Sequence, residues 1–269
     1  MEVQKLIQRY RYSIILLKQL VKTDFKLRYQ GSALGYVWSL LRPLLLFVIL
    51  FLVFDKVFKQ GDAIPHYPVY LLLGIVLWNY FGEVTSGSVG AIVGRGDLLR
   101  KINFPKYVII LSGSFSAFIN LLLNFIVIAI FMIIGGVTVS WHALLIIPII
   151  AELFVFSIAV AFFLSALYVK FRDISYIWEV IMQAAFYATP ILYALSVVPV
   201  RYAKWLILSP MAQIIQDARY VLVTPQTQTI AHFHNSAWVW AAPFGVVAII
   251  TVVATTYFRN RSKFFAEEI

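Results

Sequence analysis

Three carboxylates lie within or beside long apolar stretches of this sequence: Glu83, Glu152 and Glu179. An ionisable group is costly to place in a membrane and is a functional candidate by default. A transferase acting there would need a second acid, a base or a metal ligand at a fixed spacing. None of the three carboxylates has a second carboxylate or a histidine at such a spacing. Catalysis within the membrane is therefore the weaker interpretation, and transport the stronger one.

The sequence offers few residues that could bind a metal ion or a nucleotide. The four histidines lie in predicted external loops, and His232 and His234 would form a metal site only on one face of a strand, a periodicity that their loop lacks. The absence of cysteine removes disulfides and thiolate metal sites. The chain also has no G-x-x-x-x-G-K-[ST] motif for binding phosphates. We therefore expect no metal and no cofactor in this chain, and ATP-driven work would need another polypeptide.

The composition indicates a polytopic membrane protein. Hydrophobic residues make up 62% of the chain and charged residues 13%, and the mean hydropathy is +0.87. Several apolar runs are long enough to cross a hydrocarbon core of about 30 Å. The net charge of +10 would suggest nucleic acid in a soluble protein. Here the basic residues flank apolar spans, so anionic lipids and topology explain them better, and we expect membrane lipids and no nucleic acid as partners.

The expected fold is an all-α membrane protein, because an open sheet would leave unpaired backbone groups in lipid. A single transmembrane domain, 27–269, follows an N-terminal segment, 1–26. Basic residues number 17 on one side of the spans and five on the other, which predicts cytoplasmic N and C termini. The six predicted transmembrane helices are approximately 34–54, 69–92, 107–134, 143–169, 174–193 and 237–258.

The N-terminal segment, 1–26, is predicted to be an amphipathic helix at the membrane interface. Apolar residues recur at a spacing of three or four, and lysines and arginines supply a basic complement for anionic headgroups. Its longest purely apolar run, Ile14 to Leu17, is too short for the core of a signal peptide. The alternative is a helix packed against a soluble partner.

Residues 24–43, DFKLRYQGSALGYVWSLLRP, join this helix to the first span. The sequence resembles the membrane-entrance motif of permease subunits of ABC-2 type polysaccharide exporters, which move lipid-linked O-antigen, capsule or teichoic acid chains. The resemblance extends from Asp24 to the C-terminus. Arg42 departs from the pattern, because relatives often carry an uncharged polar residue there. The resemblance rests on the order of Arg28, Tyr29, Ser32, Leu34, Gly35, Trp38, Leu41 and Pro43.

Two predicted cytoplasmic loops resemble the segments of this family that contact the ATPase. The first, 94–105, has a glycine at its start, a proline at its end and an aspartate before a short Leu-Leu-Arg-Lys turn, as a brief capped helix would. The second contains a Phe-Arg-Asp sequence before span five. The alternative is that they are ordinary basic loops. The resemblance assigns coupling to Gly96, Asp97, Leu98, Leu99, Arg100, Lys101, Arg172 and Asp173.

Between spans five and six, Thr189 and Pro190 break the helix, and the apolar segment 206–223 contains polar residues that lipid would not accept cheaply. A re-entrant hairpin acting as an external gate is predicted there; the alternative is an amphipathic helix on the outer leaflet. Residues two apart on a helix do not face each other, so Asp217 and Arg219 are not expected to pair. The predicted gate residues are Pro210, Gln213, Gln216, Asp217 and Arg219.

Aromatic residues make up 16% of the chain and cluster near the ends of spans one, two and five. Tyr and Trp offer stacking area and a polar tip to sugar rings, although an interfacial aromatic belt accounts for many of them. The predicted channel and entrance residues are Arg28, Tyr29, Tyr36, Trp38, Arg42, Trp178, Phe186, Tyr187 and Tyr193.

The resemblance implies a homodimer with two ATPase subunits that bind ATP and Mg, in the bacterial cytoplasmic (inner) membrane. The exported substrate would be an undecaprenyl-linked polysaccharide, with O-antigen as the first candidate. Teichoic acid, capsule and a smaller amphipathic substrate remain alternatives within the same class. An ion-coupled carrier and an intramembrane transferase are the alternatives from other classes.

Overall fold

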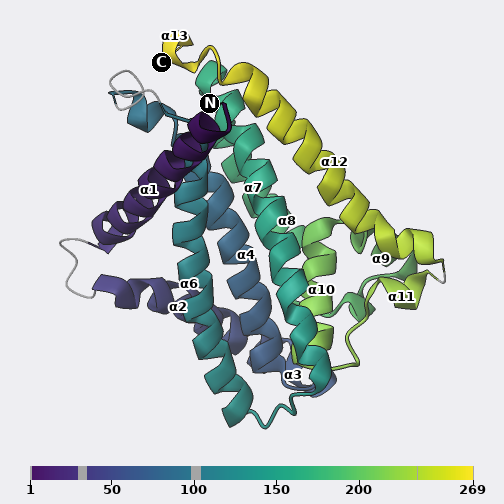
Figure 1. The fold of residues 1–269 in the computed structure, drawn as a ribbon. Coiled ribbons are helices and arrows are strands. Elements are labelled where there is room, and N and C mark those ends of the chain that lie inside the picture. Colours follow the sequence, from purple (N-terminus) through teal and green to yellow (C-terminus); the bar gives the residue numbers. More distant parts are fainter. Residues whose placement is uncertain (1, 30–34, 98–103, 235, 269) are drawn as a thin grey trace.

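The computed structural model describes residues 2–29, 35–97, 104–234 and 236–268, and over these ranges the chain forms helices and no strand (Figure 1). The two termini lie at the same end of the molecule, which we call the termini end (Figure 1). The elements in chain order are α1 (Glu2–Tyr29), η1 (Gly35–Val37), α2 (Trp38–Phe51), η2 (Leu52–Val57), α3 (Gln60–Ala63), α4 (Tyr67–Val89), η3 (Val93–Arg95), α6 (Tyr107–Ile134), η4 (Trp141–Leu145), α7 (Ile146–Lys170), α8 (Ile174–Ala188), η5 (Leu195–Val197), α9 (Val200–Leu206), α10 (Pro210–Leu222), α11 (Ile230–Phe233), α12 (Ala237–Arg261) and α13 (Phe265–Glu268).

Within the described ranges, four helices are long and apolar enough to cross a membrane: α4, α6, α7 with its preceding turn η4, and α12. They correspond to the predicted spans two, three, four and six. The helices at predicted spans one and five are shorter, with 14 residues in α2 and 15 in α8. The six residues of η2 extend α2 in π-helical geometry, and α8 ends at Ala188, before the predicted limit of 193. Six spans therefore remain a prediction.

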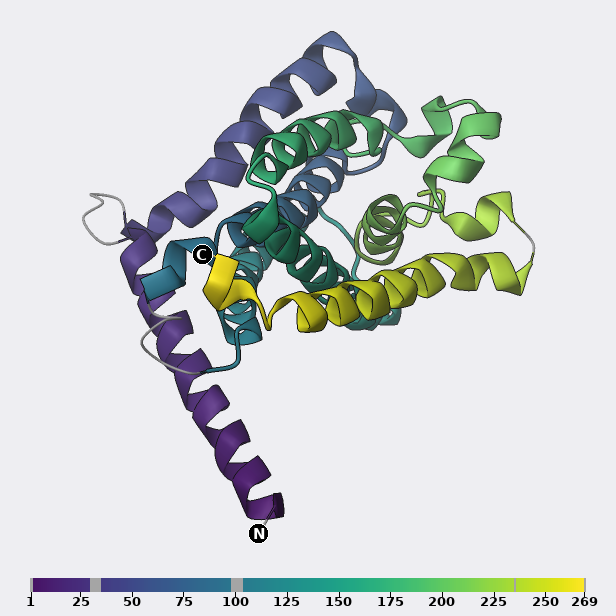
Figure 2. The same ribbon diagram turned by 90° about the horizontal axis from the view of Figure 1, so that it is seen from above.

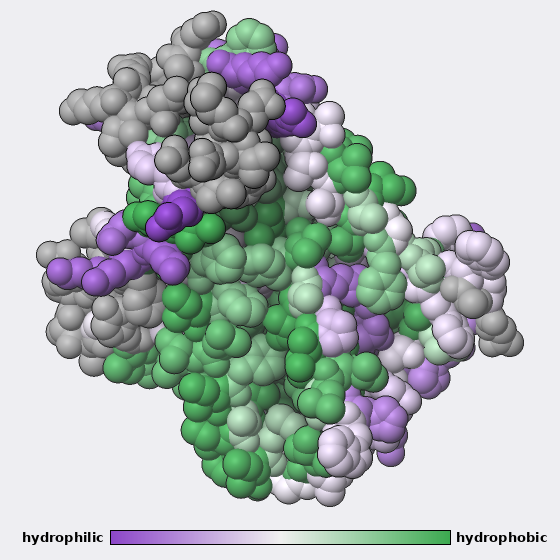
Figure 3. Space-filling view, viewed as in Figure 1, coloured by the Kyte–Doolittle hydropathy of each residue, from purple (hydrophilic) through white to green (hydrophobic). Residues whose placement is uncertain are grey.

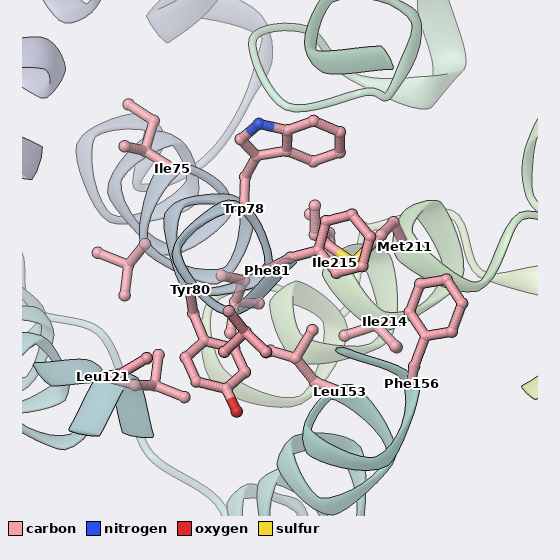
Figure 4. Close-up of a cluster of buried hydrophobic side chains, with 14 of the residues drawn as sticks. Ile75, Trp78, Tyr80, Phe81, Leu121, Leu153, Phe156, Met211, Ile214 and Ile215 are labelled. Carbon is pink, nitrogen blue, oxygen red and sulfur yellow. The ribbon is translucent and has the colours of Figure 1, made fainter. Parts of the chain in front are cut away.

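The core of the molecule is built around α4, whose residues are mostly apolar and mostly buried against other helices. Side chains of α6, α7 and α10 pack on it from different directions (Figure 4). The rings of Phe81 and Phe156 stack with centroids 5.3 Å apart and planes 4° from parallel. Ser88 donates a hydrogen bond of 3.3 Å to the carbonyl of Ala161, so α4 and α7 approach closely at this point. α4 is thus the central helix of the bundle, and the other helices pack around it.

The last long helix, α12, runs along one edge of the bundle and packs mainly on α7 (Figure 2). Its residues Val247, Ala254 and Phe258 are buried, whereas Ile249 and Val252 are exposed. A large apolar surface covers α6 and its surroundings, and hydrophilic residues gather near α13 (Figure 3). An apolar exterior of this kind is suited to lipid.

The predicted N-terminal helix, 1–26, continues to Tyr29 and forms α1. Leu16, Leu17 and Leu20 of α1 pack beside a small buried cluster at the start of α6, which includes Val108 and Ile109. Other apolar residues of α1 are uncovered, among them Ile14 and Ile15, which are 50% and 58% exposed. α1 therefore has one face against the bundle and a second apolar face available to lipid, as an interfacial helix would.

Candidate functional site

Two adjoining cavities follow α4. The larger, about 620 Å³, lies between α2, α4 and α6, and the smaller, about 460 Å³, lies between α2, α4 and α8. Trp78, Asn79 and Ser86 line both cavities, so we treat them as one groove and call it the α4 groove. Asn79, Glu83 and Ser86 are spaced by four and three residues, which places them along one face of the helix. This polar stripe faces the groove, while the remaining faces of α4 form the core.

Five of the predicted channel residues lie at the α4 groove. Trp38 and Arg42 of α2 line the larger cavity. Trp178, Phe186 and Tyr187 of α8 line the smaller one. Two separate segments of the sequence, about 140 residues apart on the printed numbering, thus contribute to a single groove. The sequence predicts both sets as channel residues, and the structure brings them together in the lining of one groove.

The aromatic residues of α8 are anchored on α4. The indole Nε1–H of Trp178 donates to the hydroxyl of Thr85 at 3.2 Å, and its ring meets Phe81 edge-on at a centroid distance of 6.2 Å. Phe186 makes a similar edge contact with Trp78 at 6.0 Å. These contacts hold α8 by its aromatic side chains, since none of its residues is buried. The groove wall is therefore rigid where the rings touch α4 and open between them.

Uncharged polar side chains of α6 also face the larger cavity. Asn120 donates a hydrogen bond of 2.9 Å to the Glu83 carboxylate. Asn124, one turn further along, donates to the carbonyls of Asn120 at 2.8 Å and of Ser39 at 3.3 Å. These hydrogen bonds join α6 to α4 and to α2. Both asparagines also line the cavity, a role that the four-residue spacing of two asparagines could have indicated.

The remaining channel candidates are not placed at the groove. Tyr193 lies outside the lining of both cavities, and its hydroxyl donates to the carbonyls of Tyr187 at 3.3 Å and Ala188 at 3.0 Å, capping the end of α8. Arg28 and Tyr29 belong to the last turn of α1, and Tyr36 to η1. The side chains of these three residues lie outside the described part of the structure.

A polar network joins α1 to the bundle at the termini end. The guanidinium of Arg95 donates to Asp24 at 2.5 Å and to Ser112 at 3.3 Å. The Ser112 hydroxyl in turn donates to the other carboxylate oxygen of Asp24 at 3.1 Å. We call these three residues the α1 clamp. Arg95 directly precedes the predicted coupling segment, so the clamp connects that segment to α1.

Only part of the predicted coupling set is described. Gly96 is buried and Asp97 is exposed, whereas Leu98, Leu99, Arg100 and Lys101 lie outside the described residues. At the far end of the same loop, Lys106 donates to the carbonyl of Ser262 and lies 5.6 Å from the ring centroid of Phe265. The loop is thus fastened to the C-terminal tail as well as to α1.

The second predicted coupling loop is exposed. Arg172 lies over the ring of Tyr168 at 5.3 Å, and Asp173 is at the start of α8. No ion pair joins Arg172 to Asp173, both of which are described. Both side chains are therefore accessible to a partner at this end of the molecule.

The predicted gate residue Arg219 is fully buried. Its guanidinium donates to the carbonyls of Tyr70 at 3.0 Å, Pro190 at 2.5 Å and Ile191 at 2.7 Å, and it lies 3.6 Å from the centroid of the Tyr70 ring. The break after α8 frees carbonyl groups that have no partner within a helix, and a cation satisfies several of them at once. Arg219 thereby fastens α10 to α4 and to residues 189–192, which we call the α8 break.

The other gate candidates also face inward. Gln213 and Gln216 are buried, and Pro210 occupies the first turn of α10, where its missing N–H costs nothing. Gln213 donates to Asp217 at 2.5 Å and to Glu152 of α7 at 3.5 Å. Burial raises the pKa of the Asp217 carboxyl, and the Gln213 hydrogen bond acts in the opposite direction. As expected, Asp217 and Arg219 do not pair with each other.

Comparison with known proteins identifies the class. Residues 15–223 match the model of the ABC-2 type transporter family. The chain is 31% identical over 97% of both sequences to the O-antigen export system permease protein RfbA of Myxococcus xanthus, and 30% identical over 95% of both to the protein of the same name from Klebsiella pneumoniae. It is 20% identical to the polysialic acid transport protein KpsM of Escherichia coli over 76% of this chain and 80% of that protein.

The chain therefore belongs to the ABC-2 type transporter family. It is a multi-pass protein of the bacterial inner membrane, and the relatives named above are permease and transport proteins for polysaccharides, the class that the sequence motifs resemble. The family match covers α2, α4, α6, α7, α8 and α10 completely, and thus every element that lines the α4 groove or carries the Arg219 contacts.

Proposed function

We propose that this chain forms half of the membrane passage of an ATP-driven exporter that moves an undecaprenyl-linked polysaccharide, with O-antigen as the first candidate. The α4 groove is the observation that carries the proposal. Its walls combine the aromatic rings of Trp78, Trp178 and Phe186 with uncharged polar groups such as Asn79 and Gln183. Rings offer area to the apolar faces of sugars, and amides offer hydrogen bonds to their hydroxyls. The names of the full-length relatives support the same substrate class.

The passage is completed by a second copy of the chain. The groove is open at its α2 and α8 walls, and both helices carry exposed apolar residues, including Ile49 of α2 and Val180 of α8, which are 61% and 66% exposed. α8 also exposes Glu179 and Gln183, which lipid would accept only at a cost. Burial against the same face of a second copy, around a water-filled path, accommodates both kinds of residue. A two-fold symmetric contact of this kind is the commonest way for identical chains to assemble.

The energy comes from a separate ATPase, since this sequence has no phosphate-binding loop. Two such subunits, with ATP and Mg, would sit at the termini end, on the cytoplasmic side. They would contact the 96–101 segment together with Arg172 and Asp173. The α1 clamp and the Lys106 contacts fasten the two ends of the first loop to the terminal elements, and so provide a path by which movement of the ATPase reaches the membrane helices. The 206–223 segment, which contains α10, would form the external gate.

The proposal is tested by purifying the tagged chain from its own host. We expect an ATPase to co-purify in equal amount, and a deletion strain to accumulate lipid-linked polymer inside the cell until the chain is restored. Transport by the chain alone in a proton gradient would instead identify an ion-coupled carrier, and chemical turnover by the chain alone would identify an intramembrane transferase. If the deletion strain accumulates capsule or teichoic acid precursors, the proposed export mechanism stands and the substrate is that polymer instead of O-antigen.

A further inference from the structure

A third, smaller cavity lies apart from the α4 groove. It has a volume of about 180 Å³ and is enclosed by the start of α4, the chain after the α8 break and the loop after α10. A single water needs only about 10–15 Å³ of such space. The pocket therefore accommodates a small organic molecule. Its polar lining comes from Tyr70, Ser196, Thr224, Gln226, Thr227 and Gln228.

The lining is polar but uncharged. No Asp, Glu, Lys, Arg or His is among the residues that line the pocket. Hydroxyl and amide groups both donate and accept hydrogen bonds, which suits a ligand that carries many hydroxyls. A phosphate or carboxylate would meet no cation here, and a metal ion would meet no carboxylate or imidazole. The chemistry of the lining thus favours a neutral polyhydroxylated molecule.

Two polar atoms of this segment lack partners. The Thr227 hydroxyl and the Gln228 amide oxygen are both buried, and neither finds a hydrogen-bond partner within the described part of the chain. Buried polar groups are normally hydrogen-bonded, so orphaned atoms of this kind call for a ligand or for water. The backbone that carries them is fixed: Thr227 N–H donates to the Thr224 carbonyl at 3.2 Å, and Gln216 donates to the Gln228 carbonyl at 3.4 Å.

We propose that this pocket binds one uncharged sugar residue of the exported polymer, an inference that rests on the proposed export function and deepens it. Tyr70 connects the pocket to the gate. Its side chain lines the pocket, and its ring lies against the Arg219 guanidinium, which holds the α8 break and α10 together. A sugar in the pocket therefore touches Tyr70, whose ring lies against the Arg219 guanidinium and whose carbonyl accepts one of its hydrogen bonds, so that an occupied pocket acts on the gate region through this residue.

The test uses the purified full-length chain and saturation-transfer NMR with methyl glycosides of glucose, galactose and mannose as neutral probes and glucuronate as a charged probe. Thr227→Val and Gln228→Met remove the orphaned groups with little change of shape, and Thr255→Val is the control, because that exposed hydroxyl is bonded within α12 at 2.6 Å. We expect saturable binding of at least one neutral probe. Each pocket variant should raise its half-saturating concentration about fivefold to tenfold, the size of one lost hydrogen bond.

Three results would overturn the assignment. No saturable signal from any neutral probe would mean that the pocket holds water only. Equal binding to wild type and both pocket variants would place the sugar elsewhere. Glucuronate binding as tightly as the neutral probes would contradict the uncharged character of the site. Each of these results leaves export by wild-type cells, the readout of the proposed function, unaffected, so failure of one proposal is distinguishable from failure of the other.

Discussion

Two of the helices that line the α4 groove, α4 and α8, have similar apolar compositions and opposite surroundings. In α4, 78% of the most apolar window is buried inside the chain, whereas α8 has no buried residue. α4 presents its polar stripe and the Trp78 ring to the groove and meets other helices on its remaining faces. α8 is held on α4 by the Trp178 and Phe186 rings, by the Trp178 hydrogen bond to Thr85 and by the Met182 side chain, and it exposes Glu179 and Gln183 together with apolar residues. α4 therefore serves the fold of one chain, while most of the surface of α8 is exposed to a partner, to lipid or to a substrate.

The largest effect should follow from removing the cation that fastens α4 to α10. Replacement Arg219→Met leaves the carbonyls of Tyr70, Pro190 and Ile191 without their donor. We expect a loss of about 3–5 kcal/mol of stability, because several charge-assisted hydrogen bonds disappear in a buried site. Thermal unfolding in detergent measures it, with Arg201→Met on the exposed face of α9 as the control. A normal midpoint for Arg219→Met would show that α4 does not depend on these contacts.

A smaller loss is expected at Gly74 of α4, which the Arg219 side chain approaches closely. A Cβ atom at this position would lie 2.5 Å from the Nη2 atom of Arg219. Because that guanidinium is locked by carbonyl groups, Gly74→Ala should cost about 1–3 kcal/mol through overpacking. Gly87, on the same helix, has open space around it, so Gly87→Ala should be neutral or slightly stabilising. Equal midpoints for the two variants would contradict the tight packing of this part of α4.

The α1 clamp should matter less for stability than for coupling. Asp24 and Arg95 are 19% and 27% exposed, so Asp24→Asn should cost about 0.2–1 kcal/mol. The ion pair between Arg261 and Glu268, at 24% and 31% exposure, provides a control of similar environment. Both Asp24→Asn and Glu268→Gln should leave folding intact, but only Asp24→Asn should lower the polymer exported per ATP hydrolysed. The double variant Asp24→Arg with Arg95→Asp, which exchanges the two charges, should recover part of the lost export per ATP hydrolysed. If all variants export the same amount of polymer per ATP, the clamp has no role in coupling.

The smallest change in stability is expected on α8. Replacement Gln183→Leu alters an exposed groove residue and should change stability by less than about 0.5 kcal/mol. Export should nevertheless fall, because the passage loses a hydrogen-bonding group for sugar hydroxyls. Ile133→Leu, at the exposed end of α6 and outside the groove lining, should affect neither quantity. Loss of stability with unchanged export would mean that α8 belongs to the fold in the same way as α4.

Much of the architecture could be read from the sequence. The predicted span 107–134 coincides with α6, and 143–169 and 237–258 differ from α7 and α12 by three residues or fewer at each end. Long apolar runs with charged flanks define such helices locally. The break at Thr189 and Pro190 was also predictable, because proline disfavours helical geometry in the residue before it. The limits of α2 and α8 were predicted less well, since short helices depend on their neighbours.

The candidate site was only partly accessible to the same reasoning. Trp38 and Trp178 could be nominated as channel residues from their types and positions, but their meeting in one groove depends on how α2 and α8 pack against α4. Asn79 and Ser86 were not nominated, because single polar residues in an apolar span usually serve helix packing. That Asn79 and Ser86 share one face of α4 indicates a binding role only once the structure shows that this face lines the groove.

The sequence by itself determined that this chain is an apolar, helical membrane protein with basic loops, because hydropathy and charge act residue by residue along the chain. The tertiary structure alone decided which residues meet. Arg219 is predicted from the sequence as a polar gate residue. In the structure it donates to the Gln216 side chain, one turn before it, and to the backbone carbonyls of residues 70, 190 and 191, which are more than 25 positions away. Local rules say that a broken helix leaves carbonyl groups unpaired, but only the packing of α4, α10 and the α8 break determines which cation satisfies them.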